Sequence, residues 1–214
     1  MYSKRFGLVA MTLTAAALLT ACNGEDTGTG AASSSGAHSS QSTGHDTAAA
    51  AGHGSGGWAK NQAGASFFGS LLDGASEVPV KGGPAVGDKD GHALALMRIQ
   101  GDQVSYAFTF TGIQTPTLGH LHQGVKGVNG DVKIPFFTKK LADGSKFTYG
   151  TVTVEDADLL QRIKAHPSNW YFNLHTDERP GGAVRGQAYK LPSSTHVPDS
   201  ISEDTLNSLV SSGQ

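Results

Sequence analysis

Two histidines separated by one residue, His120 and His122, are the side chains in this sequence best placed to do chemistry together. In a β-strand, residues two apart project from the same face, so the two imidazoles would lie side by side while Leu121 points to the other face. Imidazole nitrogens are common ligands of metal ions. Asn129-Gly130 then gives a strong signal for a short hairpin turn. The segment therefore predicts a strand with two metal-ligating side chains, followed by a tight turn.

The segments around this pair alternate between apolar and polar residues with a period of two, which is typical of β-strands. Turn sequences such as Asp-Gly and Gly-Gly separate most of them. Many short strands with frequent turns predict an all-β protein, an antiparallel sandwich or barrel. We take an antiparallel Greek-key β-sandwich as the expected fold. The strand at 92–99 has apolar residues on both faces and is expected to be buried on both sides. The predicted strands are 67–72, 92–99, 104–110, 118–123, 132–136, 147–154, 170–175 and 184–191.

Helical patterns are rare in the sequence. One short amphipathic helix is predicted at 155–165, and Pro167 follows its end. The segment 192–214 is a polar tail in which a second short helix is a candidate, because Ser200 and Glu203 have the spacing of a capping box before an apolar face. We expect no chemistry from this terminal helix.

The first 21 residues, 1–21, have the features of a bacterial lipoprotein signal peptide. Lys4 and Arg5 precede an apolar run, and the small residues before Cys22 resemble a lipobox. Cleavage before Cys22 and lipidation of its thiol would anchor the protein to a lipid bilayer. The alternative is an ordinary secretory signal that happens to contain a cysteine. Asn23 after the cysteine resembles lipoproteins of the outer membrane, so we expect a location in the bacterial cell envelope, on the periplasmic or surface face.

The segment 22–65 consists of the lipidated cysteine and a stretch rich in Gly, Ser, Ala and Thr, which we predict to be a flexible, disordered linker. Its scattered histidines are interpreted as polar linker residues. The folded domain is expected at 66–191. Lipidation would use the 1 cysteine of the sequence, which excludes a disulfide, a thiolate metal site and a cysteine nucleophile from that domain. The formal net charge of -2 gives no basic face for nucleic acid.

Three separated motifs resemble the CHRD (chordin) domain family and occur in the family's order. They are Leu72-x-Gly-x-x-Glu77-Val-Pro79, Gly119-His-Leu-His122 with its following glycines, and Trp170-Tyr-Phe-Asn-Leu-His-Thr176 with Pro180-Gly-Gly-Ala-Val-Arg-Gly186. The resemblance covers nearly all of 66–191. It implies the fold and an extracytoplasmic location, whereas the biochemical role of single bacterial CHRD domains is poorly defined.

The strongest motifs contain His120, His122 and His175, and this placement motivates the hypothesis that the three residues bind one metal ion. Three imidazoles without a thiolate suit copper, zinc or nickel, and the general order of affinity favours copper. His92 and His166 are candidate fourth ligands, although both also fit the ends of secondary-structure elements. The alternative interpretation of the three-histidine set is structural: imidazoles that hydrogen-bond the backbone of glycine-rich loops.

A more distant resemblance is to the Cu/Zn superoxide dismutases, which are also Greek-key sandwiches with a His-x-His pair on a strand and a late Gly-Gly-x-x-Arg-type segment near the copper. The segments 119–122 and 181–185 are similar to these elements. The domain lacks the cysteines of the dismutase disulfide, and no Asp/His cluster is spaced like the dismutase zinc site. This resemblance implies a copper-only redox protein in which Arg185 steers an anion toward the metal.

Three classes of function therefore remain open. The leading class is a lipid-anchored CHRD protein that binds copper or zinc through three histidines and has no catalytic residues. The second class is a copper-only, dismutase-like redox enzyme. The third class is a metal-free adhesion or scaffold module, which would fold without metal and whose stability would not respond to it.

Overall fold

The computed structural model describes residues 62–198 and 200–211. The predicted signal peptide, the predicted lipidation of Cys22 and most of the predicted linker lie outside these described residues. No described helix has the length and apolar character needed to cross a bilayer. The strands are β1 (Ser66–Asp73), β2 (His92–Gln100), β3 (Gln103–Thr111), β4 (Leu118–Gln123), β5 (Val132–Phe137), β6 (Phe147–Thr153), β7 (Trp170–His175), β8 (Val184–Gln187) and β9 (Tyr189–Lys190). The helices are α1 (Ala157–Ala165) and α2 (Glu203–Ser211), and the 3-10 turns are η1 (Gly74–Ser76) and η2 (Pro167–Asn169).

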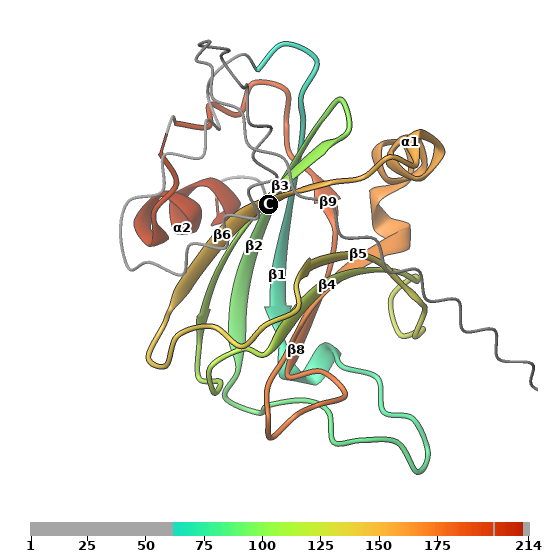
Figure 1. The fold of residues 1–214 in the computed structure, drawn as a ribbon, viewed down its shortest axis with the longest axis vertical. Coiled ribbons are helices and arrows are strands. Elements are labelled where there is room, and N and C mark those ends of the chain that lie inside the picture. Colours follow the sequence, from blue (N-terminus) through green and yellow to red (C-terminus); the bar gives the residue numbers. More distant parts are fainter. Residues whose placement is uncertain (1–61, 199, 212–214) are drawn as a thin grey trace, which may run out of the picture. The chain divides into compact units, whose positions relative to one another are not determined.

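All strand pairs are antiparallel and belong to one sheet (Figure 1). The strand order is β5-β4-β7-β8-β1-β2-β3-β6, with β9 beside β1. The connections from β3 to β4 and from β6 to β7 cross between the two halves of this order. The end strands β5 and β6 contact each other without forming a ladder, so the sheet is nearly closed. The predicted all-β antiparallel fold is confirmed. Its strands form a single curled sheet.

The inner face of the sheet carries the main hydrophobic core. Phe68, Phe108 and Phe172 are completely buried there, because alternate residues of each strand point inward. The helix α1 adds its apolar face to this core. Asp156 caps α1 by accepting a hydrogen bond from the Leu159 N–H at 2.8 Å, and the predicted helix is confirmed.

A second apolar cluster lies on the outer face of β1, β2 and β3, where α2 and the chain before it pack against the sheet (red in Figure 1). Strand β2 is therefore buried on both faces, as its sequence predicts. A second helix is confirmed in the tail, but its cap is Ser202, whose Oγ accepts a hydrogen bond from the Thr205 N–H. The cluster consists of Phe67, Leu96, Ala107, Leu191, Val197, Ile201, Leu206, Leu209 and Val210.

The outer face of β4, β7 and β8 is polar, and most of its side chains are nevertheless buried. Loops cover it: 74–91 between β1 and β2, 124–131 between β4 and β5, and 176–183 between β7 and β8. Polar groups that are buried in this way need partners within the protein. This face holds the histidines singled out by the sequence.

The prediction of a tight turn at Asn129-Gly130 is wrong. The turn of loop 124–131 lies at Val125–Val128, where the Val128 N–H donates to the Val125 carbonyl at 3.0 Å, and Gly127 has a φ of 78°. Gly130 instead passes so close to β4 that a Cβ atom would lie 1.6 Å from the Gln123 carbonyl oxygen. The glycine is required here by a close backbone approach, because the loop folds back over the outer face.

Candidate metal centre

Strands β4 and β7 bring three imidazoles together. His120 and His122 lie on β4, and His175 is the last residue of the neighbouring strand β7. Leu121 and Leu174 belong to the inner core, so the alternating strand geometry turns all three histidines to the outer face. The predicted side-by-side projection of His120 and His122 is confirmed.

The three histidines form a compact cluster. Each can offer one ring nitrogen such that all three nitrogens lie within 4.8 Å of one another. The closest pair is His120 Nδ1 and His175 Nε2, at 3.1 Å. The residues keep only 8%, 9% and 9% of their surface exposed for His120, His122 and His175, so a bound ion would be largely shielded from water.

Backbone carbonyls determine which ring nitrogens carry protons. His122 Nδ1 lies 2.9 Å from the Gly130 carbonyl oxygen, and His175 Nδ1 lies 2.9 Å from the Pro180 carbonyl oxygen. A carbonyl only accepts hydrogen bonds, so both Nδ1 atoms donate, and the Nε2 atoms of the neutral rings carry lone pairs. His175 Nε2 then accepts from His120 Nδ1, whereas His122 Nε2 is buried without a hydrogen-bond partner.

Metal-ligating histidines commonly donate their second ring N–H to a backbone carbonyl, which fixes the ring and leaves the other nitrogen for the metal. His122 and His175 have this arrangement. The alternative interpretation, in which the imidazoles hydrogen-bond the backbone of the loops, is therefore correct for His122 and His175. These hydrogen bonds are compatible with metal binding.

The electrostatic environment keeps the imidazoles neutral. Burial lowers the pKa of His120 to about 4, and the neighbouring His175 and His122 lower it further. Burial also lowers the pKa of His122 and of His175, while their hydrogen bonds to Gly130 and Pro180 act in the opposite direction. Metal ions bind neutral imidazole, so protonation of the rings does not oppose binding at neutral pH. A metal ion at His175 Nε2 would displace the hydrogen bond from His120 Nδ1.

A profile of the CHRD domain matches residues 68–188, more than half of the sequence. The chain belongs to the CHRD domain family. No curated protein and no solved structure matches the chain. The matched range contains all three clustered histidines and ends before α2 begins. The resemblance to superoxide dismutases stays a prediction.

The other predicted ligands lie elsewhere in the CHRD domain. His92 is exposed at the start of β2, and His166 is exposed at the C-terminal end of α1. Neither belongs to the three-histidine cluster. Strands β7, β8 and β1 separate β4 from β2 in the sheet, so His92 is several strand spacings away from His120.

Arg185, the candidate for anion steering, is buried on the outer face beneath loop 124–131. Only 2% of its surface is exposed. Its guanidinium donates to Asn129 Oδ1 at 3.0 Å and to the carbonyls of Val125 and Val128 at 3.2 and 2.8 Å. It also lies over the Tyr171 ring, 3.5 Å from the ring centroid. These contacts give Arg185 a structural role, and its steering of an anion stays a prediction.

Two further polar residues of this face were not singled out as functional by the sequence. Asn173 lies opposite His120 in the β4–β7 register, and its Nδ2 donates to Glu77 Oε1 at 2.9 Å. Burial raises the pKa of Glu77 to about 7, although the Asn173 hydrogen bond and Arg185 oppose the shift. The period-two rule that groups His175 with residue 173 identifies Asn173, whereas no local pattern places Glu77 beside it.

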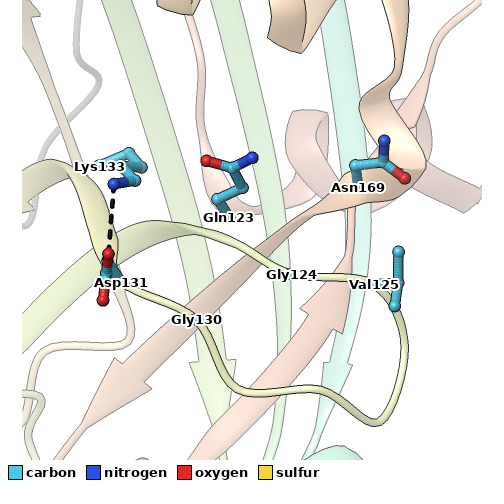
Figure 2. A pocket seen from close by; sticks show the side chains of 7 residues that line it. All are labelled: Gln123, Gly124, Val125, Gly130, Asp131, Lys133 and Asn169. Atoms are coloured by element: carbon cyan, nitrogen blue, oxygen red, sulfur yellow. Dashed lines mark hydrogen bonds and ion pairs between the residues drawn. The ribbon is translucent and has the colours of Figure 1, made fainter.

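A polar hollow lies next to loop 124–131 but is not lined by the three histidines. Figure 2 shows Gln123 and Asn169 beside it, with the Lys133 ammonium 3.4 Å from Asp131 at its edge. Gly124, Val125 and Gly130 also line it, so this side of the loop faces open space. The hollow carries no group that indicates a ligand.

Proposed function

We propose that this CHRD domain binds one metal ion through His120, His122 and His175, and that copper is bound in preference to zinc. The observation that carries the proposal is the buried, unpartnered His122 Nε2 within the cluster. A buried polar atom without a partner costs free energy. A metal ion at this nitrogen would remove that cost.

The donor set supports copper. The cluster offers three imidazole nitrogens and includes no carboxylate or thiolate. Nitrogen ligands of this kind bind Cu(II) more tightly than Zn(II) according to the general affinity order of divalent metals. When bound, copper would supply one-electron redox chemistry. The chain's own contribution is to hold three neutral imidazoles at fixed orientations in a shielded site.

Calorimetric titration of the mature chain with Cu(II) and with Zn(II) tests the proposal. We expect tight binding of about one copper per chain, lost when His120, His122 and His175 are all changed to alanine. A matched variant with the exposed His92 and His166 changed to alanine should bind like the wild type. Equal copper affinity of the wild type and the three-alanine variant would overturn the proposal.

A copper redox enzyme is the second candidate, because three protein ligands leave a coordination position for a substrate. This candidate predicts that the copper-loaded protein consumes superoxide and that His120→Ala abolishes the reaction. Copper binding without consumption of superoxide would show that the protein binds copper but is not this enzyme. A fold whose melting temperature does not respond to metal would favour the adhesion or scaffold module.

We further propose that the protein is held in the bacterial cell envelope by a lipid on Cys22. The support is the signal-peptide and lipobox pattern of the first 22 residues. Membrane fractionation tests it: the wild type should sediment with membranes, and Cys22→Ser should not. An unchanged distribution of the Cys22→Ser protein would contradict lipid anchoring through this residue.

A further inference from the structure

We infer that Arg185 and Tyr171 are positioning residues for the metal ligand His122. Together, as the Arg185–Tyr171 clamp, they hold loop 124–130 so that the Gly130 carbonyl keeps the His122 proton on Nδ1 and leaves Nε2 free for a metal. The inference rests on the proposed metal site, but its effect on His122 is present without metal.

The first part of the clamp is a stack of three flat groups. The Arg185 guanidinium lies 3.5 Å from the Tyr171 ring centroid. The Tyr171 ring is parallel to His122, with centroids 4.7 Å apart and an interplanar angle of 8°. Tyr171 lies opposite His122 in the β4–β7 register. A ring held in this way cannot turn its plane without breaking the stack, so the stack fixes the orientation of the His122 ring.

The second part of the clamp is a set of hydrogen bonds to the loop. Arg185 donates to the carbonyls of Val125 and Val128 and to the side chain of Asn129. The Tyr171 hydroxyl lies 3.3 Å from the Gly130 N–H, which donates to it. These bonds hold the loop on both sides of its turn and place the Gly130 carbonyl 2.9 Å from His122 Nδ1.

The tip of the loop has little other support. Its far side borders the open hollow, and 48% of Val125 and 51% of Val128 are exposed. The base of the loop is held by Gln187, which donates to the Gly124 carbonyl, and by two backbone bonds, from the Gly124 N–H to the Asn169 carbonyl and from the Gln123 N–H to the Asp131 carbonyl. Asn129 also donates to the Val78 carbonyl. Between these anchors, the loop is positioned mainly by Arg185 and Tyr171.

A competing state of His122 is available when the clamp is weakened. The Asn173 side chain acts to raise the pKa of His122, while Asn173 Oδ1 and His122 Nε2 are both buried without a hydrogen-bond partner. If the Gly130 carbonyl moves away, the proton of neutral His122 can move to Nε2 and donate to Asn173 Oδ1. That tautomer blocks the nitrogen that a metal needs.

Arg185→Lys is the first test variant, because an ammonium keeps the charge and lacks the planar fork that reaches three acceptors and stacks on Tyr171. Asn129→Ala is the second; on an exposed loop residue it removes one acceptor of Arg185 together with the donor to the Val78 carbonyl, and it spares the sheet. Arg162→Lys on the exposed face of α1 is the matched control. The metal-free proteins are compared by ¹⁵N NMR of the imidazole rings, and their copper affinities by titration.

We expect wild-type His122 to be protonated on Nδ1, and Arg185→Lys to populate the Nε2–H form and to lose about 10- to 100-fold in copper affinity, the usual effect of removing an outer-shell partner. Asn129→Ala should shift both readouts in the same direction by less, and Arg162→Lys should shift neither. A folded Arg185→Lys or Asn129→Ala protein with an unchanged His122 tautomer would overturn the inference. A shifted tautomer in a protein that never binds copper would support the positioning and overturn the proposed function.

Discussion

At the scale of single residues, the three buried histidines should make metal affinity insensitive to mild acid. Protons compete with a metal only near the pKa of the folded-state imidazole, which burial lowers for all three and to about 4 for His120. We expect copper affinity to be nearly constant between about pH 8 and 6.5, the ordinary pKa of histidine, and to fall in more acidic solution. Titrations at a series of pH values check this expectation. A steep loss of affinity between pH 8 and 7 would contradict it.

The same shifts predict an acid-sensitive fold in the absence of metal. Unfolded imidazoles take up protons near pH 6.5, whereas folded His120 does so only near pH 4. The stability present above pH 6.5 is therefore lost as the pH falls toward 4. Urea unfolding of metal-free protein should show a smaller loss over this range for His120→Ala than for the wild type, and equal losses would contradict the assignment.

The contribution of Glu77 to folding stability should depend on pH in the opposite direction to that of His120. Its folded-state pKa is raised to about 7 from an ordinary value of 4.5, mainly by burial. Its contribution to stability is full below pH 4.5 and is lost as the pH rises through 7. We expect Glu77→Gln to be more stable than the wild type at pH 8, by about 1–2 kcal/mol, and similar to it at pH 4.5. Urea unfolding at both values measures this, and a less stable variant at pH 8 would be the contrary result.

The period of two was sufficient to predict how His120 and His122 project, because that geometry is local to one strand. The contacts of Arg185 were not predictable, because its partners Val125, Val128 and Asn129 come from a loop 56 to 60 residues earlier in the chain. A lone arginine in a sequence carries no sign of whether it will be solvated or buried among carbonyls.

At the scale of elements, loop 124–131 joins the fold to the site, and Gly130 is its tightest point. An added Cβ would lie 1.6 Å from the Gln123 carbonyl oxygen, which is backbone and cannot move alone. We expect Gly130→Ala to destabilise the protein by more than about 2 kcal/mol and to weaken copper binding by displacing the carbonyl that bonds His122. Denaturant unfolding and copper titration measure both effects. Lys126→Ala in the same loop should change neither quantity. A Gly130→Ala protein with unchanged stability would contradict the close approach of Gly130 to the Gln123 carbonyl.

The boundaries of the elements were largely predictable where alternation was unbroken. The predicted strand at 118–123 coincides with β4, and the helix predicted at 155–165 begins two residues later as α1. The predicted strand at 184–191 is instead divided into two strands with different neighbours, since β8 forms most of its ladder with β7 and β9 pairs with β1. Such a break depends on a tertiary contact that periodicity does not reveal.

At the scale of the whole molecule, the tail after Leu191 should contribute to stability and not to metal binding. Val197, Ile201, Leu206 and Val210 are completely buried in the outer cluster, which lies on β1, β2 and β3 and not on the strands of the metal site. Ending the chain after Leu191 exposes Phe67 and Leu96 on that face. We expect a loss of several kcal/mol, since burial of each large apolar side chain contributes about 1.5–3 kcal/mol before entropy is counted.

Denaturant unfolding and size-exclusion chromatography of the shortened chain measure this effect, with copper affinity as the internal control. The shortened protein should be less stable and prone to self-association, and should still bind copper if folded. Unchanged stability would show that the tail does not cover the sheet. The composition of the tail gave little sign of this packing, because its apolar residues are few. The capping-box spacing of Ser200 and Glu203 and the apolar spacing at 206, 209 and 210 indicated a helix but not what it covers.

The central claim is that His120, His122 and His175 bind one copper ion, and a crystal structure of the copper-loaded protein with anomalous scattering data tests it most directly. The predicted result is one strong copper peak about 2.0 Å from a ring nitrogen of each of the three histidines, with the Nδ1 atoms of His122 and His175 still facing the Gly130 and Pro180 carbonyls. A copper peak at other residues, or no peak among the three imidazoles at full loading, would contradict the claim.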